Sequence, residues 1–236
     1  MIEFNGTRST ALGAFVERYP PRPIPQRKGE SFSVPGRSGD IQVLEDAWEN
    51  VEQTYEIYLS AEGPGLPFVA NGVTRWLTEP DGYCRLEDEY DRETFRMAVF
   101  RGPQDLQNIL NQFGRTTLKF ECMPQRWLKS GQRPITLTAA TTLHNPTGHT
   151  AFPLLTLHGS GPATLSDGAR TLTLSVTDGM QLDCQEEEAW LDSGGVITNL
   201  NGAVSGSFPR LGRGDTTISW TGGITGVELI PRWYEL

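Results

Sequence analysis

The stretch Thr171-Leu172-Thr173-Leu174-Ser175-Val176 alternates a hydroxyl side chain with an apolar one. Because successive side chains of a β-strand point to opposite faces, this period of two predicts a strand with one buried and one exposed face. From Pro134 onward we find no helical period, and apolar pairs separated by Gly, Asn, Asp and Pro turns predict a β-sandwich. These pairs are Ile135/Leu137, Leu155/Leu157, Ile218/Trp220 and Val227/Leu229.

The N-terminal half also predicts short strands. Ser31–Val34 and Ile41–Leu44 flank the Gly-containing loop Pro35–Asp40 and are expected to form a hairpin. A second hairpin is expected from Tyr83–Tyr90 and Glu93–Phe100. Tyr55, Ile57 and Leu59 alternate with polar residues and predict a half-buried strand. Phe95, Met97 and Val99 are expected to line one face of the second hairpin, and Leu118, Phe120 and Cys122 to form one more strand.

Two short helices and one proline-rich segment interrupt these strands. Apolar residues at three- and four-residue intervals predict a helix over about Pro67–Leu77, and Pro103 at the start of Gly102–Gly114 predicts another. Tyr19–Pro25 holds four prolines and is expected to be an extended arm, because proline lacks the N–H that a ladder requires. Turn residues over 124–134 suggest a domain boundary, so we expect a mainly β protein with domains 1–133 and 134–236.

Composition excludes several classes of function. The net charge is −9 and the basic residues are scattered, which argues against specific nucleic-acid binding. No apolar run is long enough for a membrane helix, so we expect no membrane insertion and synthesis in the cytosol. The three cysteines Cys84, Cys122 and Cys184 are widely separated, which favours core residues over disulfides or zinc ligands.

Candidate catalytic and metal-binding residues are few. His144, His149 and His158 lie close together in sequence and could supply a base or a metal ligand, but turn and strand-edge positions fit their spacing better. An acidic group could serve a glycosidase or bind calcium, yet no calcium-loop motif is present and solvated loops often carry such runs. Its members are Asp178, Asp183, Glu186, Glu187 and Glu188. We therefore expect no enzyme, no cofactor and no bound metal.

Two further features have a binding interpretation beside a structural one. Trp190, Trp220 and Trp233 could stack on sugars, but core packing is the better interpretation, with Trp190 the residue to inspect for exposure. Arg213-Gly214-Asp215 forms an RGD triplet, which in an extracellular animal protein would suggest integrin contact; here we interpret it as part of a tight turn.

Motifs spread in order over both halves resemble one known family. In the first half these are Phe4-Asn5-Gly6, the Val34–Asp40 loop, Trp76-Leu77 and Phe120-Glu121-Cys122-Met123-Pro124. In the second half they are Asn145-Pro146, Phe152-Pro153-Leu154 before Gly159-Ser160-Gly161, Leu182-Asp183-Cys184, Leu211-Gly212-Arg213-Gly214-Asp215 and Ile230-Pro231-Arg232-Trp233-Tyr234. Their order and spacing resemble the distal tail protein (Dit) family of siphophages.

The resemblance implies a structural protein of the virion, located at the tail tip and assembled in the bacterial cytoplasm. It implies an N-terminal β domain that joins copies of itself into a ring, usually a homohexamer, and a C-terminal galectin-like β-sandwich. The ring would connect the tail tube protein to tail-tip and receptor-binding proteins and let DNA pass. The alternative is a carbohydrate-binding adhesion module of a phage baseplate.

A ring closes only if one head-to-tail contact repeats with the right rotation, so function should reside in surfaces. We expect the subunit interface to use the N-terminal strands, the proline-rich arm and the hairpin loop, through strand addition at free edges. The candidate interface residues are Pro20, Pro21, Pro23, Pro25, Pro35, Gly36, Arg37 and Asp40. The acidic excess is expected to line the channel, because a negative wall repels DNA phosphate.

Overall fold

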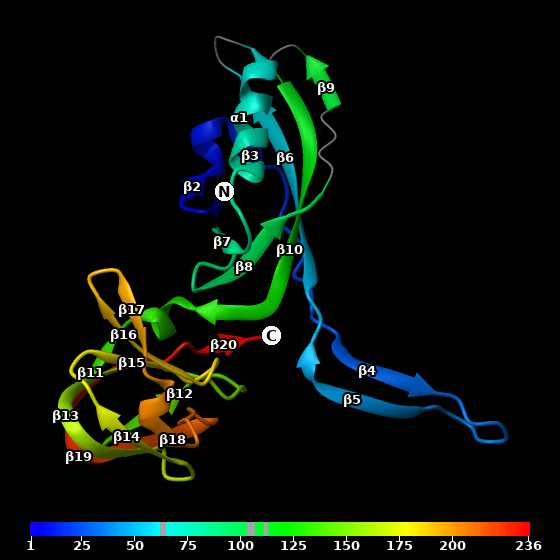
Figure 1. The fold of residues 1–236 in the computed structure, drawn as a ribbon. Coiled ribbons are helices and arrows are strands. Elements are labelled where there is room, and N and C mark those ends of the chain that lie inside the picture. The colour runs from blue at the N-terminus through cyan, green and yellow to red at the C-terminus, as the bar shows by residue number, and fades with distance from the viewer. Residues whose placement is uncertain (62–64, 103–106, 111–112) are drawn as a thin grey trace. The chain divides into compact units, whose positions relative to one another are not determined.

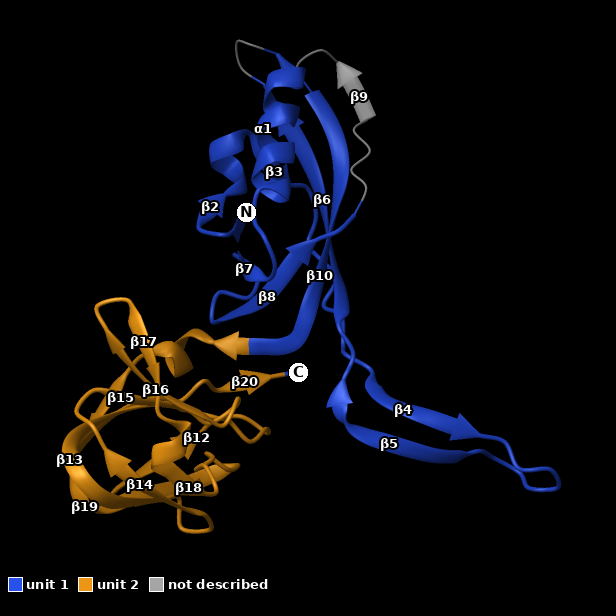
Figure 2. Ribbon diagram, in the orientation of Figure 1, with its two compact units in different colours: residues 1–126, 236 blue, residues 127–235 orange. Residues whose placement is uncertain are grey.

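The computed structural model describes residues 1–61, 65–102, 107–110 and 113–236, the third of these ranges by its backbone alone. The chain forms two compact units, of which unit 1 comprises residues 1–126 with Leu236 and unit 2 comprises residues 127–235 (Figure 2). Strands dominate the described part of both units, so the predicted mainly β fold class is confirmed.

Unit 1 is organised around a sheet with the strand order β2-β1-β7-β8-β10-β6-β3 (Figure 1). A 3-10 turn, η1 (Ser9–Leu12), precedes β3, and β9 pairs with the start of β10. The strands are β1 (Ile2–Phe4), β2 (Thr7–Arg8), β3 (Ala14–Val16), β6 (Val51–Ser60), β7 (Cys84–Asp88), β8 (Thr94–Phe100), β9 (Gln107–Leu110) and β10 (Phe113–Leu128).

The core of unit 1 lies between this sheet and the helix α1 (Leu66–Thr78). Tyr55, Ile57 and Leu59 of β6 are buried at every second position, as their period of two predicts. On the neighbouring β10 the buried residues include Leu118, Phe120 and Cys122, which also confirms the expected strand. Burial raises the pKa of the Cys122 thiol to about 12, so this cysteine is an inert core residue.

One α-helix, α1 (Leu66–Thr78), packs against the described part of this sheet. Pro67 stands in its first turn, where the missing N–H costs nothing, and the predicted helix is confirmed. Trp76 is buried and its indole N–H donates to the backbone carbonyl oxygen of Phe4 at 3.0 Å. Phe4 in turn contacts Phe120 with ring centroids 5.1 Å apart, so the helix is fixed to the sheet through aromatic contacts.

One prediction for unit 1 is wrong. Gly102–Gly114 was expected to be helical, but Gln107–Leu110 forms β9 and Phe113-Gly114 begins β10; residues 103–106 and 111–112 lie outside the described residues. A short apolar run fits either period, and pairing of these two segments satisfies their backbone groups as a hairpin. In β8, Phe95, Met97 and Val99 alternate along one face, as expected; Phe95 is buried, while Ala98 and Phe100 on the other face pack into the main core of unit 1.

The hairpin expected around Pro35–Asp40 is confirmed and is longer than its sequence pattern suggested. β4 (Arg27–Phe32) and β5 (Ile41–Trp48) pair antiparallel as a separate two-stranded sheet within unit 1. Figure 1 shows both strands as one long arm.

Unit 2 contains a second sheet, with the strand order β11-β19-β13-β15-β16-β17. β12 pairs with β19, β14 pairs with β13 and β18, and β20 pairs with the end of β10. The elements are η2 (Lys129–Gln132), β11 (Ile135–Leu137), β12 (Thr141–Asn145), β13 (Leu154–Ser166), β14 (Thr171–Val176), β15 (Met180–Asp183), β16 (Glu188–Ser193), β17 (Val196–Asn199), η3 (Asn201–Ala203), β18 (Val204–Gly206), β19 (Gly214–Ile230) and β20 (Tyr234–Glu235).

The unit 2 sheet curls around one core because the paired strands β13 and β19 bend where their register shifts. Their register shifts between His158 and Gly159 and again before Ala163. A β-carbon at Gly159 would lie 2.0 Å from the carbonyl oxygen of Gly223, and one at Gly223 would lie 2.0 Å from that of Ser160. Only glycine allows the two backbones to approach this closely, so these residues create the bend.

The period-two pairs of the second half line this core. Leu155, Leu157, Leu172 and Leu174 are all buried, together with Val176, as the alternation predicts. Trp220 and Trp233 are half-buried and pack against the same cluster, which supports their interpretation as core residues. Trp190 is also half-buried.

Candidate interaction surfaces

The β4–β5 hairpin exposes an apolar face. Phe32 is paired with Ile41 across the hairpin, and Val43 lies two residues further along β5, so the three side chains share one face. Their exposed fractions are 49%, 40% and 55%. Exposed apolar side chains grouped on one face are typical of an interaction surface.

Leu44, on the opposite face of β5, is 52% exposed, and every residue from Gln26 to Asp46 is classed as exposed. A two-stranded hairpin with neither face covered is marginal on its own in water. We therefore expect the arm to be stabilised by a partner.

The loop at the tip of this arm contains four of the expected interface residues, namely Pro35, Gly36, Arg37 and Asp40, all exposed. Gly36 and Gly39 both have left-handed backbone angles, with φ of 81° and 80°, which explains why the turn needs glycine. Asp40 is held in place because its carboxylate accepts a hydrogen bond from the Ser31 hydroxyl at 3.1 Å. The loop is thus a shaped tip that presents the Arg37 side chain to solvent.

The proline-rich segment Tyr19–Pro25, which we call the strap, has no regular secondary structure, as expected, and lies against unit 1. The Gln53 amide donates to the carbonyl oxygen of Pro21 at 2.9 Å, and the Arg96 guanidinium donates to that of Pro23 at 3.3 Å. The Tyr19 hydroxyl donates to the backbone oxygen of Tyr90 at 3.3 Å. These contacts link the strap to β6, β8 and the β7–β8 turn.

Four expected interface residues lie on the strap, and the structure separates them by exposure. Pro20 and Pro25 are buried within unit 1 itself, whereas Pro21 is exposed and Pro23 is half-buried. The most exposed apolar side chain of the strap is Ile24, at 87%. A contact between the strap and another molecule would therefore use Ile24 and Pro21 rather than the two buried prolines.

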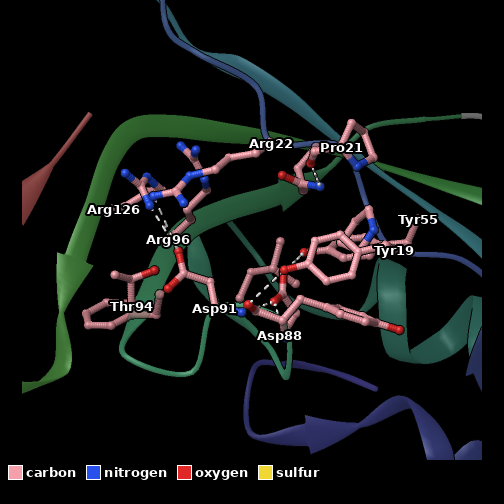
Figure 3. Close-up of a pocket in the computed structure, with 14 residues that line it drawn as sticks. Tyr19, Pro21, Arg22, Tyr55, Asp88, Asp91, Thr94, Arg96 and Arg126 are labelled. Carbon is pink, nitrogen blue, oxygen red and sulfur yellow. Dashed lines mark hydrogen bonds and ion pairs between the residues drawn. The ribbon is translucent and has the colours of Figure 1, made fainter.

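A small cavity of about 70 Å³ lies beneath the strap (Figure 3). On one side the Tyr55 hydroxyl donates to a carboxylate oxygen of Asp88 at 2.9 Å. Burial, followed by the charge of Asp88, raises the pKa of Tyr55 well above its ordinary value, so this phenol stays protonated. On the other side Arg126 pairs with Asp91 at 3.0 Å. The sequence pattern gave no signal for this cavity, because its residues come from distant segments.

The three histidines make separate contacts in unit 2. His144 lies 2.7 Å from Asp215 and His158 lies 3.3 Å from Asp178, while His149 stacks on Tyr234. The first two pairs involve exposed side chains on a sheet surface. Among the residues that the structure describes, no histidine side chain hydrogen-bonds to a serine or cysteine side chain.

Asp178 and Asp183, two of the acidic residues considered as a possible site, also have separate partners. Both carboxylate oxygens of Asp183 accept hydrogen bonds from Arg232, at 2.8 and 2.9 Å, and Asp183 also caps the turn that follows β15. A carboxylate oxygen of Asp178 accepts a hydrogen bond from the backbone N–H of Gly159 at 3.1 Å. In the RGD triplet, Gly214 has φ of 73° and begins β19, in keeping with a turn.

Among the residues that the structure describes, no group of three or more His, Cys, Asp or Glu side chains is arranged to hold a metal ion. In the same residues, no helix has the length and apolar character needed to cross a membrane.

Comparison with known proteins gives a structural likeness to a phage protein. No protein-family model matches the sequence, and no curated protein does. Among solved structures, the chain is similar to the SPP1 Dit (gp 19.1) protein, described as a paradigm of the hub adsorption apparatus in phages that infect Gram-positive bacteria. The TM-score is 0.74, with 15% sequence identity, over 100% of this chain and 98% of that chain. The likeness covers both units, so the chain has a Dit-like fold.

Proposed function

We propose that this protein is a distal tail protein of a siphophage or prophage, a structural hub at the tail tip. The observation that carries the proposal is the likeness to a phage hub protein over the full length of both chains. The order of sequence motifs gives independent support, because it resembles the same family without any use of coordinates. The proposed hub is a homohexameric ring that joins the tail tube protein to tail-tip and receptor-binding proteins and lets DNA pass.

The hairpin arm supports self-association. The apolar face of Phe32, Ile41 and Val43 gains stability if a second copy covers it, because apolar surface leaves water. Both outer edges of a two-stranded sheet also offer backbone N–H and C=O groups to another strand. We propose that the arm reaches the neighbouring copy, with the loop Pro35–Asp40 at its tip.

The strap is proposed to contribute a second, smaller contact through Ile24 and Pro21. Replacing Ile24 with serine tests this without disturbing the buried prolines, since the side chain is almost fully exposed. We expect Ile24→Ser to shift the oligomer toward smaller species in sedimentation velocity. An oligomer distribution identical to that of the unchanged chain would exclude the strap from the interface.

The net negative charge of the chain agrees with a channel through which DNA passes. A net charge of −9 allows a negative channel wall, which repels phosphate and prevents DNA from adsorbing during passage.

The second candidate is a carbohydrate-binding adhesion module, favoured by the half-buried Trp190 on the unit 2 sheet. Molar mass from light scattering, combined with a glycan-array screen of the same preparation, separates the two functions. A hexamer without glycan binding supports the hub. A monomer that binds glycans, with binding lost in Trp190→Ala, supports the adhesion module and contradicts the hub.

A further inference from the structure

Three arginine side chains gather at one end of the cavity beneath the strap (Figure 3). Arg22 belongs to the strap, Arg96 to β8 and Arg126 to β10. Three segments distant in sequence thus place positive charge around one small space. Nothing in the proposed hub function requires this arrangement.

Arg96 is a buried cation without a carboxylate partner. Only 7% of Arg96 is exposed to solvent. Its guanidinium donates to the backbone oxygens of Pro23, Met123 and Pro124 at 3.2 to 3.4 Å. Among the described residues, no carboxylate oxygen pairs with it within 4.0 Å. Burial lowers the pKa of Arg96, because a charge removed from water is costly, and an anion beside it would relieve this cost.

The two carboxylates at the cavity are already engaged. Asp91 lies 3.0 Å from Arg126 and 3.9 Å from Arg22. Asp88 accepts the Tyr55 hydroxyl with one oxygen and backbone N–H groups of its own turn with the other. Neither carboxylate therefore pairs with Arg96, which remains without an anionic partner among the described residues.

Arg126 has a donor that is not used. Its Nε is buried and donates to no acceptor among the described residues, while its other nitrogens donate to Asp91 and to the backbone oxygen of Leu236. The cavity of about 70 Å³ exceeds the roughly 30 Å³ that one water occupies in the liquid. An unused donor, an unpaired cation and available space occur together.

We propose that this cavity binds a small oxyanion, with Arg96 and Arg126 as its buried ligands and Arg22 as the exposed ligand on the strap. Planar guanidinium groups offer paired N–H donors that match the oxygen spacing of phosphate, sulfate or a carboxylate. The anion would give Arg96 the charged partner that it lacks and would give the buried Nε of Arg126 an acceptor. Because Arg22 and Arg96 both belong to the contacts of the strap, the bound anion fastens the strap to the sheet.

Isothermal titration calorimetry of the full chain with inorganic phosphate tests the proposal, with potassium chloride holding the ionic strength constant. We expect saturable binding near one phosphate per chain and a matching rise in melting temperature. Acetate in a parallel titration distinguishes the source of the anion. Tighter acetate binding at the same site would indicate a carboxylate ligand rather than a phosphoryl group, and would also support the site.

Variants with opposite expected effects distinguish phosphate binding at this site from nonspecific attraction of phosphate to surface charge. Arg22→Gln should weaken phosphate binding about threefold, as for an exposed ion pair, and Arg96→Met by at least about tenfold. Asp91→Asn should tighten binding, because it removes the carboxylate that competes for Arg126. Arg101→Gln is the matched control, since Arg22 and Arg101 side chains are both 67% exposed and Arg101 lies outside the cavity.

If Arg96→Met fails to fold, the phosphate affinities of Arg22→Gln and Arg101→Gln are compared to test the site. Equal weakening by these two variants would overturn the proposal. A phosphate response no larger than that of chloride would overturn it as well. Neither result bears on ring formation, which is measured without phosphate.

Discussion

Replacing the apolar face of the hairpin arm should break the proposed ring while leaving the fold intact. The double variant Ile41→Thr/Val43→Thr keeps β-branched residues, which suit a strand, and removes apolar contact. The two side chains are 40% and 55% exposed in the single chain, so about half of each remains to be buried by a neighbour. Completing that burial is worth about 1 kcal/mol per side chain. The variant should therefore weaken each contact by about 2 kcal/mol, or about 30-fold in Kd.

Sedimentation velocity over a dilution series measures this change, and circular dichroism verifies the fold. Val196→Thr/Ile197→Thr is a matched control, because the same two residue types are 67% and 71% exposed on β17 of unit 2. The control should dissociate like the unchanged chain. Equal dissociation of the hairpin variant and the unchanged chain would refute the reasoning, as would an equal effect of the control.

Three further predictions concern stability. Asp183→Asn removes the two-oxygen pair with Arg232 and should lower the free energy of unfolding by about 2 kcal/mol in urea denaturation; an unchanged midpoint would contradict it. Burial alone would raise the pKa of Asp167, but backbone N–H groups and a guanidinium hold it below its ordinary value. A lowered pKa stabilises the fold above about pH 4 and is lost on acidification, so the stability gap between the unchanged chain and Asp167→Asn should be largest at pH 7 and shrink below about pH 4; a pH-independent gap would oppose this. Gly223→Ala places a β-carbon 2.0 Å from a carbonyl oxygen and should cost at least about 2 kcal/mol, whereas Gly148→Ala, with no atom within 4 Å, should be nearly neutral in thermal unfolding; equal effects would exclude the close approach as the cause.

The sequence predicted those elements whose own pattern determines their structure. The period of two in β6, β10 and β14 identifies both the strands and their buried faces, because side-chain alternation is a local property. Pro67 and a three- to four-residue period likewise identify α1. The expected domain limit after residue 133 follows from turn residues, while the contacts divide the chain after Arg126.

Features decided by distant partners could not be predicted. The β9 segment has an apolar spacing that fits a helix, yet pairing with β10 makes it a strand. In β8 the alternation of Phe95, Met97 and Val99 gave no indication that Arg96, on the opposite face, is buried.

The candidate interaction surfaces were predicted only in part from the sequence. The hairpin loop was recognisable from its glycines, whereas the length of the arm was not. The position of the strap depends on Gln53 and Arg96, which no local pattern connects to Tyr19–Pro25.

Electron microscopy of the purified full-length chain, with two-dimensional class averages, tests the central claim most directly. The account predicts closed sixfold rings with a central opening, and their loss in Ile41→Thr/Val43→Thr. A uniform population of single chains at high protein concentration, or open filaments in place of rings, would contradict it.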